Sequence, residues 1–175
     1  MKRRWLAIVG GLVVLGVLLI MQIYPRNVAI SLKGVEYRLG APQTGVRPIT
    51  LSLHGVFSPS LFGSPTFSGV IDVRGSVPRD RLNGQTEQIT FADHAGSILS
   101  SYARAGVIHD YLFGSLFPNA RFTQFALLVR DPNGTWSTGN GLMIAAPART
   151  RRQALRLSNA LLKPAGYVLP GHPLK

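Results

Sequence analysis

Cysteine is absent from the chain, and only 7 of its 175 residues are acidic. Without thiols the chain cannot form disulfides, use a cysteine nucleophile, bind a metal through sulfur or carry a lipidated cysteine. The shortage of carboxylates leaves little material for paired-carboxylate catalysis or for a calcium site. Positive charge dominates instead, because 19 Lys and Arg residues give a formal net charge of +12.

This positive charge is spread along the chain. Lys2, Arg3 and Arg4 are only three of the basic residues, so 16 basic residues still stand against 7 acidic ones in the remainder. A body of that sign attracts phospholipid head groups, anionic wall polymers or nucleic acid. We expect an anionic envelope polymer or lipid and no nucleic acid. The competing explanation of the charge is solubility together with an Arg-rich coding bias, because fifteen of the basic residues are Arg.

The N-terminus contains a long apolar run, from Trp5 to Ile23, in which Gln22 is the only polar side chain. As a helix it would rise roughly 28 Å, close to the thickness of the hydrocarbon core of a bilayer. Trp5 and Tyr24 stand at its two boundaries, where interfacial aromatic residues belong. We therefore predict a single transmembrane anchor over residues 5–24.

The same segment carries signals for its processing and orientation. It is longer than the apolar core of a usual signal peptide, and no Ala-x-Ala pattern follows it, so we expect it to stay uncleaved. Three basic residues lie within residues 1–4, whereas only Arg26 follows the run closely. The positive-inside rule then predicts a cytoplasmic tail over 1–4 and an extracytoplasmic domain over 25–175.

Residues 25–175 have the pattern of one β-rich domain. Nineteen glycines and twelve prolines are spread without a repeat, which suits short strands joined by turns. We predict a mainly β (α+β) fold, an antiparallel meander of about six to eight strands with one C-terminal helix packed on the sheet. Alternating apolar and polar residues predict strands at 28–32, 35–39, 49–53, 89–91, 97–102, 121–130 and 142–146, two more within 55–75, and an exposed loop at 77–88.

The turn within residues 55–75 has Leu61 and Phe62 at its tip. Two apolar side chains in a turn can fold back onto the sheet, or they can enter a membrane or a partner surface. We expect them to fold back.

The segment 151–162 is the clearest helix of the domain. Thr150 and Gln153 fit a capping box, an apolar stripe repeats at helical spacing, and Pro164 ends the pattern. Cations crowd its N-terminus, where the helix macrodipole favours anions. These cations form either an anion-binding ridge or a solvated face whose long stems cover apolar surface. The candidate anion-binding residues are Arg149, Arg151, Arg152, Arg156 and Lys163.

Two adjacent His/acid pairs, His109-Asp110 and Asp93-His94, are the candidates for catalysis. Neighbouring residues on a strand point to opposite faces, so neither pair makes a dyad, and no Gly-x-Ser-x-Gly elbow supplies a nucleophile. Asp72, Asp93 and Asp110 are the conceivable carboxylates for sugar hydrolysis. We expect no enzymatic activity, with a hydrolase that uses His94 or His109 as an alternative.

Metal and cofactor motifs are equally scarce. Four scattered histidines give no ligand spacing, and no glycine-rich phosphate loop opens a helix. The stretch from Asp131 to Gly134 begins like a calcium loop, but the acidic residues that should follow are missing, so it predicts a turn. We expect no metal and no cofactor.

The layout resembles that of small single-pass proteins of spore-forming Gram-positive bacteria to which no activity is assigned. The resembling parts are the basic start with its apolar run, LFGSPTFSGVIDVRG (61–75) and GLMIAAPARTRRQALRLSNALL (141–162). The resemblance implies a location in the cell envelope and carries over no catalytic residue.

These features predict a membrane-tethered extracytoplasmic envelope protein, without catalysis, whose basic surface contacts anionic wall polymer or lipid head groups. An accessory subunit of a membrane protein complex is the alternative from a different class. In that case Gly10, Gly11 and Gly16 would allow close contact with a partner helix.

Overall fold

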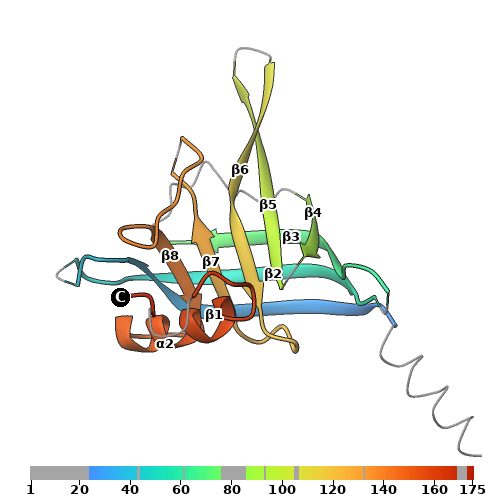
Figure 1. The fold of residues 1–175 in the computed structure, drawn as a ribbon. Helices are drawn as coiled ribbons and strands as arrows, with labels where there is room; N and C mark the ends of the chain where they lie inside the picture. Colours follow the sequence, from blue (N-terminus) through green and yellow to red (C-terminus); the bar gives the residue numbers. More distant parts are fainter. Residues whose placement is uncertain are drawn as a thin grey trace, which may run out of the picture.

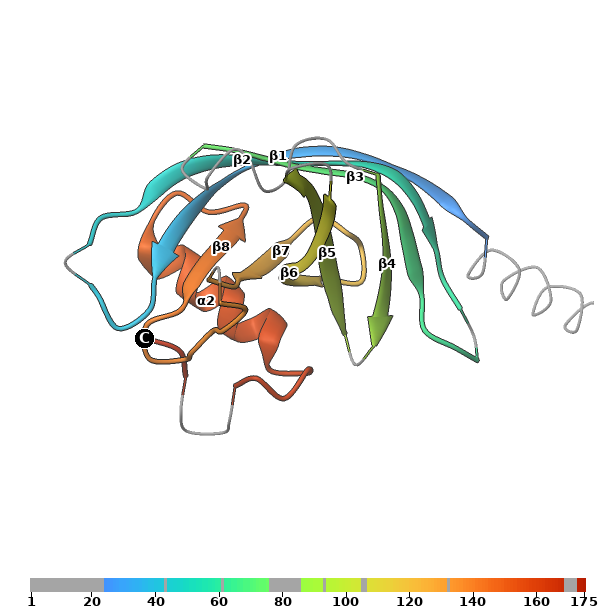
Figure 2. The same cartoon turned by 90° about the horizontal axis from the view of Figure 1, so that it is seen from above.

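A computed structural model of the chain describes residues 24–42, 44–60, 62–75, 86–92, 94–104, 107–131, 133–168 and 173–175. Eight antiparallel strands of this described part close into one barrel, with a helix packed on its outside (Figures 1 and 2). This confirms the predicted mainly β fold with a C-terminal helix. The elements are β1 (Arg26–Arg38), β2 (Arg47–Ser58), β3 (Thr66–Arg74), β4 (Thr86–Ala92), β5 (Ala95–Arg104), β6 (Val107–Pro118), β7 (Phe125–Val129), β8 (Leu142–Ala146) and α2 (Arg151–Leu162).

Each strand pairs with the next one along the chain, and β8 returns to pair with β1. The long strand β1 makes this closure possible. Its first part pairs with β2, with Arg26 opposite Phe57, and its end pairs with β8, with Arg38 opposite Leu142. In Figure 1 the layer of β1, β2 and β3 crosses the layer of β5, β6, β7 and β8. The predicted meander is therefore present, and it is closed.

Alternate residues of each strand fill the barrel. Ile49, Leu51 and Leu53 of β2 point inward, and so do Phe67 and Ile71 of β3. The sequence pattern predicted both sets as shared faces. Aromatic rings occupy one end of the interior, where Phe57, Phe91, Phe122 and Phe125 contact one another.

Gly34 marks a change in the buried face of β1. Before it, Val28 packs into the barrel, whereas after it Val35 and Tyr37 pack outside the barrel beneath α2. The apolar residues of β1 therefore stand at even-numbered, inward-facing positions before Gly34 and at odd-numbered, outward-facing positions after it, within one continuous strand.

The prediction of two separate strands at 28–32 and 35–39 is therefore wrong, because both belong to β1. The strand predicted at 49–53 and the first strand predicted within 55–75 are likewise a single strand, β2.

The helix α2 has the predicted bounds and N-cap. The backbone N–H of Gln153 donates to Thr150 Oγ1 at 3.3 Å, and Gln153 Oε1 accepts from the N–H of Arg149 at 2.9 Å. Ala154 and Leu162 are fully buried against the outer face of the barrel. The outward residues beneath the helix come from several strands and include Val35, Tyr37, Phe117, Ala126, Leu128, Met143 and Ala145.

The strand predicted at 121–130 is too long, because β7 begins only at Phe125. Asn119 explains the difference, since its Oδ1 accepts the N–H groups of Thr123 and Gln124 at 2.8 and 3.1 Å. This turn puts Phe122 at a φ of 56° and inserts its ring into the barrel. Ala126 and Leu128 are apolar because α2 covers them.

Two further predictions differ from the structure or fall outside its described part, and one strand was not predicted. The predicted loop at 77–88 is partly wrong, because β4 already begins at Thr86, while residues 76–85 lie outside the described residues. The sequence did not predict β6. The predicted membrane anchor lies outside the described residues except for Tyr24. Among the residues that are described, none belongs to a helix with the length and hydropathy needed to cross a bilayer.

Candidate functional site

A groove of about 480 Å³ lies where β1, β2 and β3 meet the connection between β8 and α2. Pro48 and Ile49 contribute to its apolar lining. Lys33, Arg74 and Arg149 contribute cationic side chains from three different elements. We call it the basic groove.

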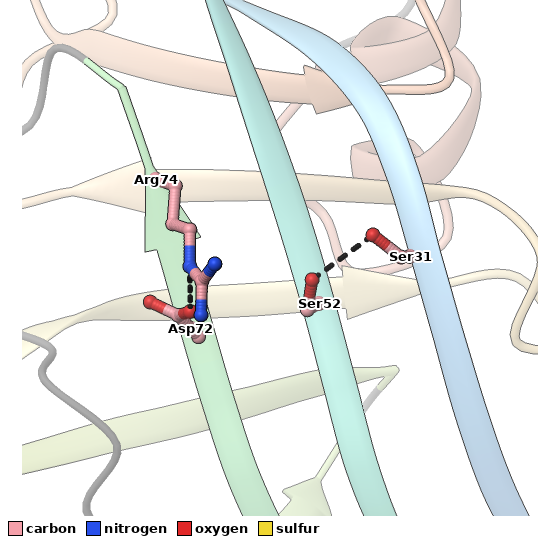
Figure 3. A network of polar contacts seen from close by, with 4 residues as sticks. All are labelled: Ser31, Ser52, Asp72 and Arg74. Carbon is pink, nitrogen blue, oxygen red and sulfur yellow. Dashed lines mark hydrogen bonds and ion pairs between the residues drawn. The ribbon is translucent and has the colours of Figure 1, made fainter.

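The strand register brings two of these cations into one row. Lys33 of β1 is opposite Thr50 of β2, and Thr50 is opposite Arg74 of β3. Arg74 Nε donates to Asp72 Oδ2 at 2.7 Å, which holds the guanidinium along the outer face of the sheet (Figure 3). Such an exposed pair contributes little to folding, so its main effect is to orient Arg74.

The neighbouring row is also polar. Ser31 and Ser52 are opposite each other on β1 and β2, and their Oγ atoms lie 3.1 Å apart (Figure 3). Asp72 is the next residue across the sheet. Hydroxyl groups can donate to a ligand or accept from it. The outer face of β1–β3 thus offers hydrogen-bonding groups beside the cations.

Arg149 reaches the groove because the connection between β8 and α2 is fixed to β1. The N–H of Ala148 donates to the carbonyl of Lys33 at 3.3 Å. The N–H of Arg149 is held by Gln153, the residue that completes the helix cap. The capping sequence therefore both starts α2 and places a cation beside Lys33.

The charges of the groove favour an anion. Three cations and no carboxylate occur among the described residues that line it, and Asp72 pairs with one of the three, Arg74. The first turn of α2 holds no acidic residue, so the positive end of the helix macrodipole adds to the same field. Guanidinium groups also match phosphate and carboxylate oxygens in a bidentate geometry.

The predicted anion-binding residues are divided among three places. Arg149 lines the basic groove. Arg151 turns back onto the domain, where its guanidinium lies 5.5 Å from the centre of the Tyr37 ring and donates to the carbonyl of Arg38. Arg152, Arg156 and Lys163 are exposed, and Lys163 follows the end of α2, roughly 16 Å from Arg152 along the helix axis.

Sequence reasoning missed Lys33 and Arg74. Arg74 lies on the polar face of a strand predicted within 55–75, two residues from Asp72, whereas Lys33 lies just beyond the strand predicted at 28–32, two residues from Ser31. Alternation therefore predicted the face of Arg74 only. Only the β1–β2–β3 register shows that they are neighbours.

The described residues do not bring the candidate catalytic side chains together. The side chains of Asp93, His109 and Asp110 lie outside the described part. His94 is exposed in the turn between β4 and β5, with a φ of 66°. Asp72 is engaged by Arg74.

The turn at 131–134 is confirmed, since the N–H of Gly134 donates to the carbonyl of Asp131 at 2.9 Å. The Asp131 carboxylate accepts hydrogen bonds from the hydroxyl and N–H of Thr135 and from Asn133, which lowers its pKa. The turn thus occupies the oxygens that a cation would need. No group of three potential metal ligands occurs within the described residues.

Comparison of the chain with protein families, curated proteins and solved structures gave no match.

Tyr37 gives the domain a pH dependence. Burial raises its pKa to about 12, against the smaller opposing effects of its hydrogen bond to Ser158 and of the Arg151 charge. The folded state therefore keeps the phenolic proton between pH 10 and 12 while the unfolded state loses it. Stability should fall across that window by about 3 kcal/mol.

An absorbance titration at 295 nm checks this, because Tyr37→Phe should remove one late step and flatten the stability profile above pH 10. A late step that persists in Tyr37→Phe would contradict the assignment.

Proposed function

We propose that the protein is a membrane-tethered, non-catalytic envelope module that binds an anionic polymer in the basic groove. The convergence of Lys33, Arg74 and Arg149 from three elements supports this reading. A polymer with regularly spaced phosphates or carboxylates can contact the three cations and the Ser31–Ser52 row together.

The position of the groove favours a polymer over lipid head groups. The tether predicted from the sequence ends just before β1, at Tyr24. Lys33 is seven residues beyond Arg26, which is roughly 23 Å along the strand. Head groups of the anchoring membrane lie near the start of β1, whereas a wall polymer extends away from the membrane.

Neutralising the groove tests the proposal. The full chain in detergent micelles is titrated with polyphosphate, and the variant Lys33→Gln/Arg74→Gln/Arg149→Gln should bind about tenfold or more weakly, because charge-assisted hydrogen bonds are lost. Binding of the unmodified chain should weaken as salt is added. Polyglutamate in a parallel titration tells whether carboxylates serve as well as phosphates.

The matched control removes the same three charges elsewhere. Arg152→Gln/Arg156→Gln/Lys163→Gln lies on exposed positions of α2 and its end, and should change the affinity by less than about threefold, through the general field alone. Equal losses in the two triple variants would show that net charge, and not the groove, attracts polyphosphate. A lack of salt-sensitive binding to either polymer would overturn the proposed function.

A further inference from the structure

The loop between β2 and β3 presents Phe62 to solvent with its side chain fully exposed (100%). The expectation that Phe62 folds back onto the sheet is therefore wrong, and Leu61 lies outside the described residues. The loop is held in shape by Ser60, whose Oγ accepts the N–H of Gly63 at 2.9 Å. An exposed phenyl ring on a shaped turn is available for an apolar partner.

A second exposed aromatic residue lies at the same end of the barrel. Tyr24 is 72% exposed and stands two residues before β1. Arg26 pairs with Phe57, next to the loop that carries Phe62. Figure 2 shows the start of β1 and the β2–β3 loop at one end of the long sheet.

Arginines accompany these aromatic residues. Arg26 stacks on the Phe57 ring, with 5.0 Å to the ring centre, and donates to the carbonyl of Ala120 at 3.0 Å. Arg121, the next residue, is exposed. The sequence of the three segments at 24–27, 58–66 and 119–124 contains no acidic residue. Aromatic and basic side chains together are typical of surfaces that meet the lipid–water interface.

The short length of chain before β1 indicates that the partner of this surface is the membrane itself. Only Tyr24 and Pro25 separate the apolar run from Arg26, so at most about 10 Å separates its last residue from the first strand. The head-group layer on one side of a bilayer is itself roughly 5–8 Å thick. A barrel tethered by this run would hold the Phe62 loop at the membrane surface.

We infer that Phe62 and Tyr24, flanked by Arg26 and Arg121, form a membrane-contact surface that enters the interfacial layer of the bilayer holding residues 5–23. The inference rests on the tether of the proposed function and goes beyond it. Contact through this loop, in addition to the tether, gives the barrel a second point of attachment and fixes its orientation. The basic groove, which contains Lys33 roughly 23 Å further along β1, then lies away from the lipid.

The absence of cysteine makes the test direct, because any introduced thiol is the only one. The full chain is reconstituted in vesicles of phosphatidylcholine and phosphatidylglycerol, with a nitroxide at Ser64→Cys in the loop. The label should collide with a water-soluble nickel complex several-fold less often than a label at Gly45→Cys. Gly45 lies in the loop between β1 and β2, at the opposite end of β2 from the Phe62 loop. Adding Phe62→Asp to Ser64→Cys should restore the collisions.

A third label, at Val14→Cys, separates the two claims. If Val14→Cys is shielded and Ser64→Cys is as accessible as Gly45→Cys, the contact surface is refuted while the tether stands. If Val14→Cys itself collides freely with nickel, the tether and the contact surface fail together. Shielding of Ser64→Cys that survives Phe62→Asp would also refute the role of Phe62.

Discussion

Replacing Phe67 by alanine should lower the free energy of unfolding by about 3–5 kcal/mol, the largest effect expected of a single side chain here. Phe67 is fully buried in the barrel, opposite Phe57 on β2 and Ile89 on β4. Its ring also lies 6.4 Å from that of Phe122. The cavity left by its removal would lie inside the barrel, beneath the β2–β3 and β3–β4 strand pairs.

Urea unfolding of the full chain in detergent, monitored by the circular dichroism signal of the sheet, measures this decrease in the free energy of unfolding. Phe62→Ala is the matched control, because the same atoms are removed from a fully exposed side chain. Its free energy of unfolding should stay within about 0.5 kcal/mol of the unmodified value. Similar losses in the two variants would contradict the assigned inner and outer positions.

Replacing Gly34 by valine should cost about 3 kcal/mol or more, because the barrel closes at this residue. A Cβ atom there would lie 2.5 Å from the carbonyl oxygen of Ala145 and 2.8 Å from Cβ of Ala146. Both neighbours belong to β8, and the ladder between β1 and β8 begins at Val35. The strands would have to separate to admit the side chain.

The same unfolding measurement applies, with Gly45→Ala as its control. A Cβ atom at Gly45 meets nothing within 4 Å, so the change should be neutral or stabilise by up to about 1 kcal/mol through the unfolded state. A Gly34→Val variant as stable as the unmodified chain would show that β1 and β8 do not close the barrel in this register.

Local patterns were sufficient for the helix, for β8 and for the inward faces of β2 and β3. Thr150 and Gln153 define the start of α2 by side-chain bonds to nearby backbone, which sequence spacing can reveal. The inward faces of β2 and β3 follow from strict alternation. Each of these features depends on residues a few positions apart.

Features that depend on distant segments were not predictable in the same way. The shift of the buried face at Gly34 arises because α2, more than a hundred residues later, covers the end of β1. The basic groove combines Lys33, Arg74 and Arg149, whose proximity requires the sheet register and the closed barrel. The arginines at 149–152 were predicted to bind an anion, and of these Arg149 lines the basic groove, whereas Arg151 contacts Tyr37 and Arg38.

The proposed function gives the two ends of the long sheet different partners. The end with Tyr24 and Phe62 would contact lipid, and the groove with Lys33 would bind polymer about seven residues further along β1. The two surfaces can be altered separately, because no residue belongs to both. Phe62→Asp should therefore leave polyphosphate binding in detergent unchanged.

A structure of the full chain with a short polyphosphate tests the basic groove most directly. We predict phosphate oxygens within hydrogen-bond distance of Lys33 Nζ and of the Arg149 guanidinium, with Arg74 still held by Asp72. Phosphate bound only to Arg152, Arg156 or Lys163, or no bound phosphate at saturating concentration, would contradict the account.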